Sequence, residues 1–312
     1  MTRVAAIDCG TNSIRLLVAD GHIGEDGRPH LADLTRQMRI VRLGKGVDAR
    51  GYLDPGAISR TVEATIEYQR MIEKLGATRT RFVATSATRD ASNSAEFIRQ
   101  IKAVIGVEPE VIVGTEEASL SFRGAVGGLG GSVRTPMLVV DIGGGSTEFT
   151  LGDDARIIGA VSLQMGAVRM NAQNPIFSKE AYDATVLQCR RLIRRDAPML
   201  LAAEKRDYWV GVGGTMTTLG AMERAIPLFD PETCDGMTIS LERVAAWGER
   251  LARISVAERG QIIGLMAHRA DIIPSGVAIL EAAMREFGIK TLKLSAHGNM
   301  DGYLKKKFQK RY

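Results

Sequence analysis

The amino-acid sequence predicts an α/β protein built from two duplicated lobes, with an active-site cleft between them. Two glycine-rich acidic loops of the same design carry this prediction, one within residues 4–13 and the other within residues 137–148. Hydrophobic periodicity around both loops indicates the same β-β-β-α-β-α order, which is typical of two similar lobes. The matching positions are Asp8 and Asp141, Gly10 and Gly143, and Ser13 and Ser146.

Each loop consists of an apolar strand, an aspartate, a tight turn of small residues and a second strand. Such a hairpin exposes backbone N–H groups at its tip, where no Cβ atom blocks a phosphate, beside a carboxylate that can hold a cation. A single glycine-rich turn is most often only a turn, and two ordinary hairpins are the alternative here. The matching positions favour two lobes that bind one polyphosphorylated ligand.

The first half of the chain alternates strands and helices after its opening hairpin. Asp54 and Pro55 are typical of a helix start, and Gly76 of a helix end. The glycine-rich stretch 124–131 has the composition of a joint between domains. Between these landmarks we expect strands at 38–43, 82–85 and 111–113, and helices at 55–75, at 95–105 and from about residue 115.

The second half repeats this plan. We therefore divide the chain into an N-terminal lobe, 1–125, and a C-terminal lobe, 126–312, whose terminal helix packs back on the first lobe. The elements expected in the second lobe are strands at 137–142, 147–151, 157–164, 208–213 and 291–295, and helices from 178, from 215, at 240–254, 257–266 and 276–287, and at the C-terminus.

The bulk composition fits an enzyme of two domains. With 312 residues, of which 45% are hydrophobic and 25% charged, the chain can form two cores and differs from disordered and collagen-like sequences. No apolar stretch approaches the roughly 18 residues of a membrane helix, and a strand begins close to the N-terminus, so neither a membrane span nor a signal peptide is expected. Three widely spaced cysteines argue against a disulfide framework or a zinc site. These features indicate a cytoplasmic protein.

The net charge is +5, and two sets of cations stand out: the tail 305–312, and a set formed by Arg36, Arg39, Arg42 and Lys45. One interpretation is a solvated helix end and the wet face of a strand. The other is an electrostatic track for a polyanion, because positive potential near a cleft steers such a ligand. No aromatic residues alternate with these cations as base stacking would require, so a nucleic-acid partner is not expected.

Four further segments carry a resemblance to a known family: 81–93, 111–118, 211–220 and 269–280. They are similar to an Ala-Thr-Ser-Ala-x-Arg-x-Ala turn after a strand, a Gly-x-Glu-Glu-Ala segment, a Gly-Gly-Thr turn and an Asp-x-x-x-Pro-x-Gly segment. With the two loops, they make the chain resemble the short form of the exopolyphosphatase/guanosine pentaphosphate phosphatase (Ppx/GppA) family, up to about residue 304. That family belongs to the superfamily of actin, the sugar kinases and the chaperone ATPases. The resemblance thus implies two actin-like (ribonuclease H-like) lobes.

Glu116 and Glu117 lie where a strand gives way to a helix. Acidic residues at a helix N-terminus often only complement the helix dipole. Consecutive helical residues point about 100° apart, so only one of the two can face a cleft well. The resemblance implies that Glu117 is the catalytic base, because it aligns with the second Glu of the family segment, and Glu116 is the neighbour most easily confused with it.

Arg89 follows a strand and a short turn, a position that points toward a cleft at the strand ends. Its guanidinium suits a phosphate, and a surface ion pair with Asp90 or Glu96 is the alternative. The turn 213–215 either binds an anion at a helix N-terminus or is only a close turn. With the resemblance, the expected substrate-binding residues are Gly10, Thr11, Asn12, Ser13, Arg89, Gly143, Gly144, Gly145, Ser146, Thr147, Gly213, Gly214 and Thr215. The expected ligands of Mg²⁺, or of another divalent cation, are Asp8, Asp141 and Glu148.

The resemblance implies a homodimeric, metal-dependent exopolyphosphatase, which hydrolyses the terminal phosphoanhydride of inorganic polyphosphate. The close alternative is the 5'-phosphohydrolase reaction on guanosine pentaphosphate (pppGpp), which belongs to the stringent response. An actin-like nucleotide-binding scaffold is an alternative of another class, and it would not need Glu117. The chain departs from the family at Met300-Asp301-Gly302, where an Arg-Glu pair usually precedes the glycine, so a phosphate contact or a domain-locking ion pair is expected to be lost. The additional C-terminal helical domains of the long relatives are also absent, which puts processive cleavage of long chains in doubt.

Overall fold

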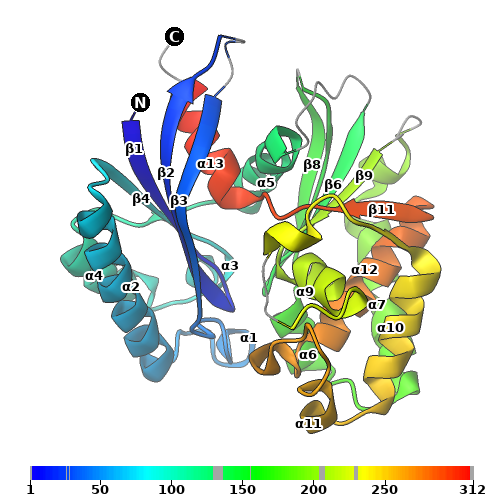
Figure 1. Ribbon diagram of the computed structural model, residues 1–312. Helices are drawn as coiled ribbons and strands as arrows, with labels where there is room; N and C mark the ends of the chain where they lie inside the picture. Colours follow the sequence, from blue (N-terminus) through cyan, green and yellow to red (C-terminus); the bar gives the residue numbers. More distant parts are fainter. Residues whose placement is uncertain are drawn as a thin grey trace. The chain divides into compact units, whose positions relative to one another are not determined.

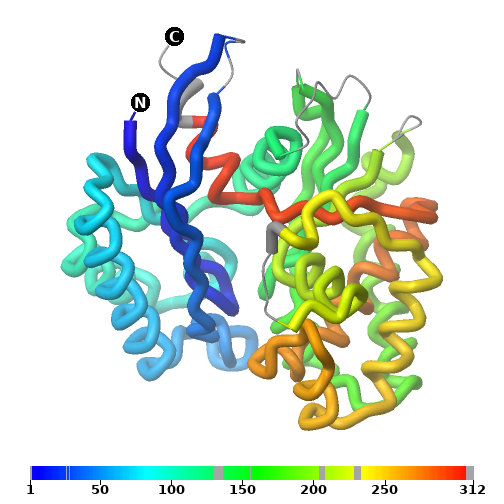
Figure 2. Tube along the Cα trace, viewed as in Figure 1, coloured from blue at the N-terminus to red at the C-terminus, as the bar shows by residue number. Residues whose placement is uncertain are grey.

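The computed structural model describes residues 2–25, 27, 29–128, 136–154, 156–203, 208–227 and 231–309. The chain forms two compact units, Met1–Gly124 together with Asn299–Tyr312, and Ala125–Gly298. The C-terminal helix α13 (Asn299–Gln309) therefore belongs to the first unit, although the whole second unit precedes it in the sequence. Figures 1 and 2 show this path, with the red helix α13 beside the blue N-terminal strands.

The first unit contains a mixed five-stranded sheet in the order β3-β2-β1-β4-β5. β1 pairs with β2 and β2 with β3 in antiparallel fashion, whereas β1–β4 and β4–β5 are parallel pairs. The strands are β1 Thr2–Cys9, β2 Ser13–Ile23, β3 Pro29–Ile40, β4 Arg79–Ala84 and β5 Glu110–Val111. The helices are α1 Val47–Arg50, α2 Pro55–Leu75, α3 Ser86–Arg89, α4 Ser94–Ile105, α5 Gly114–Gly128 and α13.

Alternating side chains of β1 supply two separate cores, because successive residues of a strand point to opposite faces of its sheet. Ala5 and Ile7 pack in a core with residues of α2 and α4. Val4 and Ala6 pack on the other face with residues of α5 and α13. The sheet of this unit is thus covered by helices on both faces, and α13 completes the second cover.

The second unit contains a six-stranded sheet in the order β10-β11-β9-β6-β7-β8. Its strands are β6 Met137–Ile142, β7 Thr147–Gly152, β8 Ile157–Leu163, β9 Tyr208–Val212, β10 Thr238–Ser240 and β11 Thr291–Leu294. Its helices are α6 Ala167–Gln173, α7 Lys179–Asp196, α8 Pro198–Leu201, α9 Gly214–Glu223, α10 Leu241–Arg253, α11 Val256–Arg259 and α12 Ile273–Phe287. Two short 3₁₀ turns lie at Pro231–Cys234 and Ala267–Arg269.

The two sheets share one pairing scheme. β6–β7 and β7–β8 are antiparallel and β6–β9 is parallel, as are the corresponding pairs of β1 with its neighbours. The predicted α/β class is confirmed, and the repeated three-strand meander of the sequence is present in both units.

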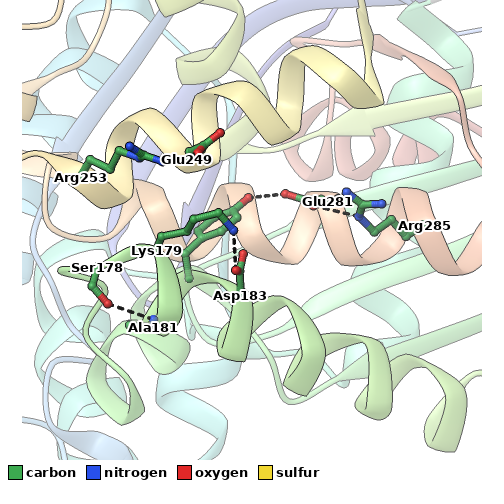
Figure 3. Close-up of polar contacts among 9 residues, drawn as sticks. Ser178, Lys179, Ala181, Asp183, Glu249, Arg253, Glu281 and Arg285 are labelled. Atoms are coloured by element: carbon green, nitrogen blue, oxygen red, sulfur yellow. Dashed lines mark hydrogen bonds and ion pairs between the residues drawn. The ribbon is translucent and has the colours of Figure 1, made fainter.

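Helices α7, α10 and α12 pack together beside the second sheet (Figure 3). The hydroxyl of Ser178 accepts a hydrogen bond from Ala181 N at 3.2 Å and caps the start of α7. The hydroxyl of Tyr182 donates to Glu281 of α12 at 2.7 Å, and Arg285 donates to the same carboxylate at 2.8 Å. A Cβ atom at Gly248 of α10 would clash with the Tyr182 ring, so this glycine permits the close approach of α10.

Several expected elements differ from the structure. The strand expected at 38–43 is the long β3, Pro29–Ile40, and the chain turns where the prediction continued it. The helix expected at 257–266 is only α11, Val256–Arg259, and Gly264 further along has a φ of 90°. The joint expected at 124–131 begins inside α5, which continues to Gly128, and residues 129–131 lie outside the described ranges. Across those ranges, no helix has the length and hydropathy to cross a bilayer.

Candidate active site

The two glycine-rich loops form the same turn. Gly10 N donates to Ser13 O at 2.9 Å, and Gly143 N donates to Ser146 O at 3.0 Å. Each bond closes a four-residue tip between two antiparallel strands, β1 and β2 in one unit and β6 and β7 in the other. The matching Gly and Ser positions of the sequence are therefore matching positions in the backbone.

In the first unit, the carbonyl groups of the loop tip are occupied by the segment that follows β3. Val41 N and Arg42 N donate to Asn12 O at 3.1 and 2.9 Å, and Gly44 N donates to Thr11 O at 2.8 Å. A Cβ atom at Gly44 would clash with the Thr11 side chain, so the close approach depends on glycine. Arg42 has a φ of 52°, which is the left-handed region.

In the second unit, the first residues of α6 donate hydrogen bonds to the carbonyl groups of the other loop tip. Ala167 N donates to Gly143 O and Val168 N to Gly144 O, both at 2.9 Å. Arg169 Nε donates to Gly145 O at 2.7 Å. Helix α6 was missed by the sequence analysis because it spans only seven residues, Ala167–Gln173.

In both loops, backbone carbonyl groups of the tip thus accept hydrogen bonds from another segment of the same unit. In the described part of the chain, no hydrogen-bond acceptor is found for the backbone N–H groups of Thr11 and Asn12, or for those of Gly144 and Gly145. Consecutive N–H groups of this kind form a concave site for anions. The loops can therefore bind phosphate oxygens through the backbone.

Two carboxylates lie next to each other at the second loop. Asp141 and Glu148 are directly opposite in the β6–β7 ladder, so their side chains share one face of the sheet. Both residues are buried, and Ser162 Oγ donates to Glu148 Oε1 at 2.7 Å. At the first loop the corresponding residue opposite Asp8 is Arg15, so the two loops differ in charge.

The turn after β9 lies against Asp141. Gly213 has a φ of 94°, and a Cβ atom there would lie 2.7 Å from Asp141 Oδ1. The next residue, Gly214, begins α9, and a Cβ atom on it would clash with the guanidinium of Arg269. Thr215 is buried in the first turn of α9. The turn therefore brings an aspartate, an arginine and a helix N-terminus together within the second unit.

Arg269 was not selected as a site residue from the sequence. It is buried in the 3₁₀ turn Ala267–Arg269 and begins the segment that resembles the Asp-x-x-x-Pro-x-Gly motif. Buried arginine is uncommon, and a 3₁₀ turn of three residues has no periodicity that would indicate burial at this position. The resemblance of that segment was the only available signal.

Arg89 and Glu117 meet within the first unit. Arg89 Nη1 lies 3.7 Å from Glu117 Oε2 and donates to Ile112 O at 2.6 Å, whereas its Nη2 is buried without a partner in the described residues. The expected alternative, an ion pair of Arg89 with Asp90 or Glu96, is not what the structure has. Ser86 Oγ instead donates to Asp90 at 3.2 Å, and Gln100 donates to Glu96 at 3.2 Å.

The two neighbouring glutamates have different environments. The Glu117 side chain is 9% exposed, whereas that of Glu116 is 39% exposed and pairs with Lys306 Nζ at 2.9 Å. A general base needs a sheltered, oriented carboxylate. Of the two residues, Glu117 is in the environment suited to that chemistry.

At Met300-Asp301-Gly302, where the family usually has an Arg-Glu pair before the glycine, this chain forms a contact of its own. Asp301 is buried and accepts two hydrogen bonds from Arg36, which extends from β3 in the same unit. This chain therefore forms an ion pair within the first unit at that position. It also removes Arg36 from the cations available to a polyanion track.

The acidic residues expected to bind a metal lie at the loops, Asp8 in one unit and Asp141 with Glu148 in the other. Within the described residues, no group of three or more His, Cys, Asp or Glu side chains is close enough together to hold a metal ion. The adjacent carboxylates of Asp141 and Glu148 are the donor type that Mg²⁺ prefers, and Mg²⁺ commonly uses only one or two protein carboxylates with phosphate oxygens and water. These two residues fit that role.

Comparisons with known proteins identify the family of this chain. The model of the Ppx/GppA phosphatase family matches residues 22–311. "Exopolyphosphatase 2" of Mycobacterium tuberculosis is 41% identical over 319 aligned residues, which cover 97% of each chain. A solved "exopolyphosphatase-like protein" is 33% identical, with a TM-score of 0.89 over 100% of both chains. The family member from Aquifex aeolicus is 28% identical, with a TM-score of 0.81 over 99% of this chain and 98% of that one. The likeness to these structures confirms the expected actin-like lobes.

Proposed function

Because this chain belongs to the Ppx/GppA phosphatase family, we propose that it is an exopolyphosphatase, which hydrolyses the terminal phosphoanhydride bond of inorganic polyphosphate and releases phosphate. The observation that carries the proposal is the buried Glu117 carboxylate at 3.7 Å from Arg89 Nη1. A scaffold that only binds nucleotide does not need such a pair. The close similarity to an exopolyphosphatase over 97% of the chain supports the same reaction.

In this mechanism, Glu117 orients a water molecule and takes its proton as the water attacks the terminal phosphorus. Arg89 uses Nη2, which has no partner among the described residues, to bind an oxygen of the transferred phosphoryl group, where charge develops in the transition state. Its bond to Ile112 O keeps the guanidinium in place before the substrate arrives. A prearranged donor of this kind is the main source of catalysis in phosphoryl transfer.

The loops act on the rest of the polyanion. Their tip amides bind phosphate oxygens, and Thr11, Ser13 and Ser146 are the hydroxyl-bearing residues at these tips, with Thr147 next to the second tip at the start of β7. The turn Gly213–Thr215 offers a helix N-terminus as a further anion site. Arg269, packed on Gly214, adds positive charge at that turn.

A divalent cation, with Mg²⁺ as the first choice, would be held by Asp141 and Glu148 in the second unit. Its contribution would be to neutralise phosphate charge and orient the leaving group. Removal of the cation with EDTA should therefore abolish turnover. The protein should still fold, because the carboxylates sit in formed strands.

Phosphate release is the deciding measurement. We expect release from long-chain polyphosphate and from tripolyphosphate in the presence of Mg²⁺, with little release from ATP. Release from pppGpp in strong preference to polyphosphate would instead favour the guanosine pentaphosphate reaction of the stringent response. Nucleotide binding without release from any of these substrates would favour the scaffold.

The proposal extends to a homodimer in the cytoplasm. Light scattering coupled to gel filtration should give about twice the 33.8 kDa of one chain. A mass of one chain at micromolar concentration would contradict the dimer without affecting the proposed reaction.

A further inference from the structure

Helix α13 lies beside α5, the helix that carries Glu117 (Figure 1), and contacts it at Asn299, Gly302 and Lys306. A Cβ atom at Gly302 would clash with the carbonyl oxygen of Leu120 and would lie 3.0 Å from Gly124 N. The two helices therefore approach backbone to backbone, which only glycine permits at this position. Leu120 also shares a buried apolar cluster with Tyr303 and Leu304 of α13.

Two polar contacts flank this approach. Ser121 Oγ donates to Asn299 Oδ1 at 2.6 Å, and Lys306 Nζ donates to Glu116 Oε1 at 2.9 Å. The ion pair joins Lys306 of α13 to Glu116 in the first turn of α5, directly beside the proposed base.

The spacing of these contacts fixes the rotation of α5 about its own axis. Glu116, Leu120 and Gly124 are four residues apart and form one face of the helix, which α13 covers. Glu117 follows Glu116 by about 100° of rotation and meets Arg89 instead. A helix held on one face by α13 thus presents its next residue toward Arg89.

We infer that Lys306 is a positioning residue for Glu117, acting through Glu116. Its ion pair holds the first turn of α5 so that Glu116 faces α13 and Glu117 faces Arg89. This inference rests on the proposed role of Glu117 as the base. It gives part of the cationic tail a function other than contact with the polymer.

The neighbouring lysine supports an internal role for this stretch. Burial lowers the pKa of the Lys305 ammonium, while Asp301 acts in the opposite direction. Lys305 and Lys306 are both only partly exposed and lie beside acidic groups of their own unit. A polyphosphate track would require ammonium groups that face solvent.

The ion pair should contribute little to global stability. Both side chains are about one-third exposed, at 33% and 39%, and pairs of this kind contribute on the order of 0–1 kcal/mol. Catalysis is more sensitive, because a small misplacement of a general base lowers the rate by one to two orders of magnitude. Variants that break the Lys306–Glu116 pair should therefore fold normally and differ from wild type in turnover.

The test compares Lys306→Met, Lys306→Arg, Glu116→Gln and the double variant Lys306→Met/Glu116→Gln. For Lys306→Met we expect kcat to fall about tenfold on tripolyphosphate and on long-chain polyphosphate alike, with KM within about twofold of wild type. Lys306→Arg should keep most of the turnover because it can restore the ion pair. The double variant should lose no more than either single variant, because both changes break the same contact.

Lys102→Met is the matched control. Lys102 pairs with Glu108 at 2.8 Å, elsewhere in the same unit, so this variant also loses one exposed Lys–Glu pair. Its kcat should equal that of wild type. Unchanged kcat in Lys306→Met, or a loss confined to the KM of the long polymer, would overturn the inference and favour the polyanion track. Failure of wild type to cleave polyphosphate would reject the proposed substrate, whereas the ratio of variant to wild-type kcat on whichever substrate is cleaved tests the positioning role.

Discussion

Arg89 Nη1 lies 3.7 Å from Glu117 Oε2, and the same guanidinium nitrogen donates to Ile112 O at 2.6 Å. The arginine is therefore oriented by the backbone and does not depend on the glutamate for its position. Two residues chosen from separate sequence segments are brought together because α3 and α5 each follow a strand, β4 and β5, and these strands are parallel neighbours. The ends of adjacent parallel strands meet at one edge of a sheet, where active sites commonly form.

Glu117→Gln should lower kcat by about 10²–10⁴-fold, because the amide keeps the size of the side chain but cannot accept the proton of water. Initial rates of phosphate release from tripolyphosphate measure this. The melting temperature should stay within a few degrees of wild type. Glu116→Gln should lose only about tenfold, so near-normal turnover in Glu117→Gln beside an inactive Glu116→Gln would mean that the other carboxylate is the base.

Arg89→Lys should lower kcat/KM by at least about tenfold although it keeps the positive charge. A lysine cannot donate to Ile112 O and to a phosphate oxygen at once in the planar geometry of a guanidinium. Steady-state kinetics with tripolyphosphate provide the measurement. Wild-type kinetics in this variant would show that charge alone is required and that the fixed orientation has no role.

The turn after β9 can be tested with Gly214→Ala. The added Cβ atom would displace the end of the Arg269 side chain, which is flexible, so the fold should survive while the guanidinium moves. We expect weaker binding of tripolyphosphate, measured by calorimetry in the inactive Glu117→Gln background. Gly298→Ala, where no described residue other than the chain neighbours has an atom within 4 Å of the new Cβ, should bind like the parent. Equal affinity of the Gly214 and Gly298 variants would exclude Arg269 from the phosphate site.

Much of the second sheet could be predicted from the sequence because its strands are apolar runs bounded by glycine. β6, Met137–Ile142, has the predicted ends, and β7 and β8 differ from the predicted strands by one residue each. Helix α2 begins after the Asp54 cap and ends at Gly76, where φ is 69°, as their chemistry indicates. Helix caps and apolar strands depend on residues that are close together in the sequence, so they can be recognised from the sequence alone.

The elements that were missed depend on long-range contacts. β3 runs from Pro29 to Ile40, although half of its residues are polar, because it pairs along the whole length of β2. No local pattern in the sequence reveals this pairing. The helix expected at 257–266 stops at Arg259, whose buried guanidinium donates to the backbone of Leu251, Ala270 and Ile176 and so ties the following loop in place. The partner of Asp301 is Arg36, far away in the sequence. Only the folded chain brings such residues together.

The buried cysteines should resist alkylation. Burial raises the pKa of the Cys189 thiol to about 12 and also raises the pKa of Cys9. At pH 8 only about one Cys189 side chain in 10⁴ is then a thiolate, the form that reacts. Mass spectrometry after iodoacetamide treatment at pH 8 should show neither residue modified in the native protein and both modified in denaturant. Rapid labelling of the native protein would contradict their burial.

A strained residue lies in the segment after β3 that binds the carbonyl groups of the first loop. Arg42 has a φ of 52°, and its amide donates to Asn12 O, so a bulky residue is kept where glycine would fit more easily. A left-handed backbone costs a residue with a side chain about 1–2 kcal/mol, whereas glycine adds up to about 1 kcal/mol of unfolded-state entropy. Arg42→Gly should therefore leave the melting temperature unchanged or slightly higher.

If the Arg42 side chain contributes to the positive potential at the loop, the same variant should raise KM for polyphosphate several-fold. The difference from wild type should shrink as salt screens the charge. Ala225→Gly is the matched control, because Ala225 has a φ of 51° in the second unit and carries no charge. It should show the same change in melting temperature with an unchanged KM. A lower melting temperature for Arg42→Gly would show that its side chain stabilises the turn, and an unchanged KM would leave the residue with a purely structural role.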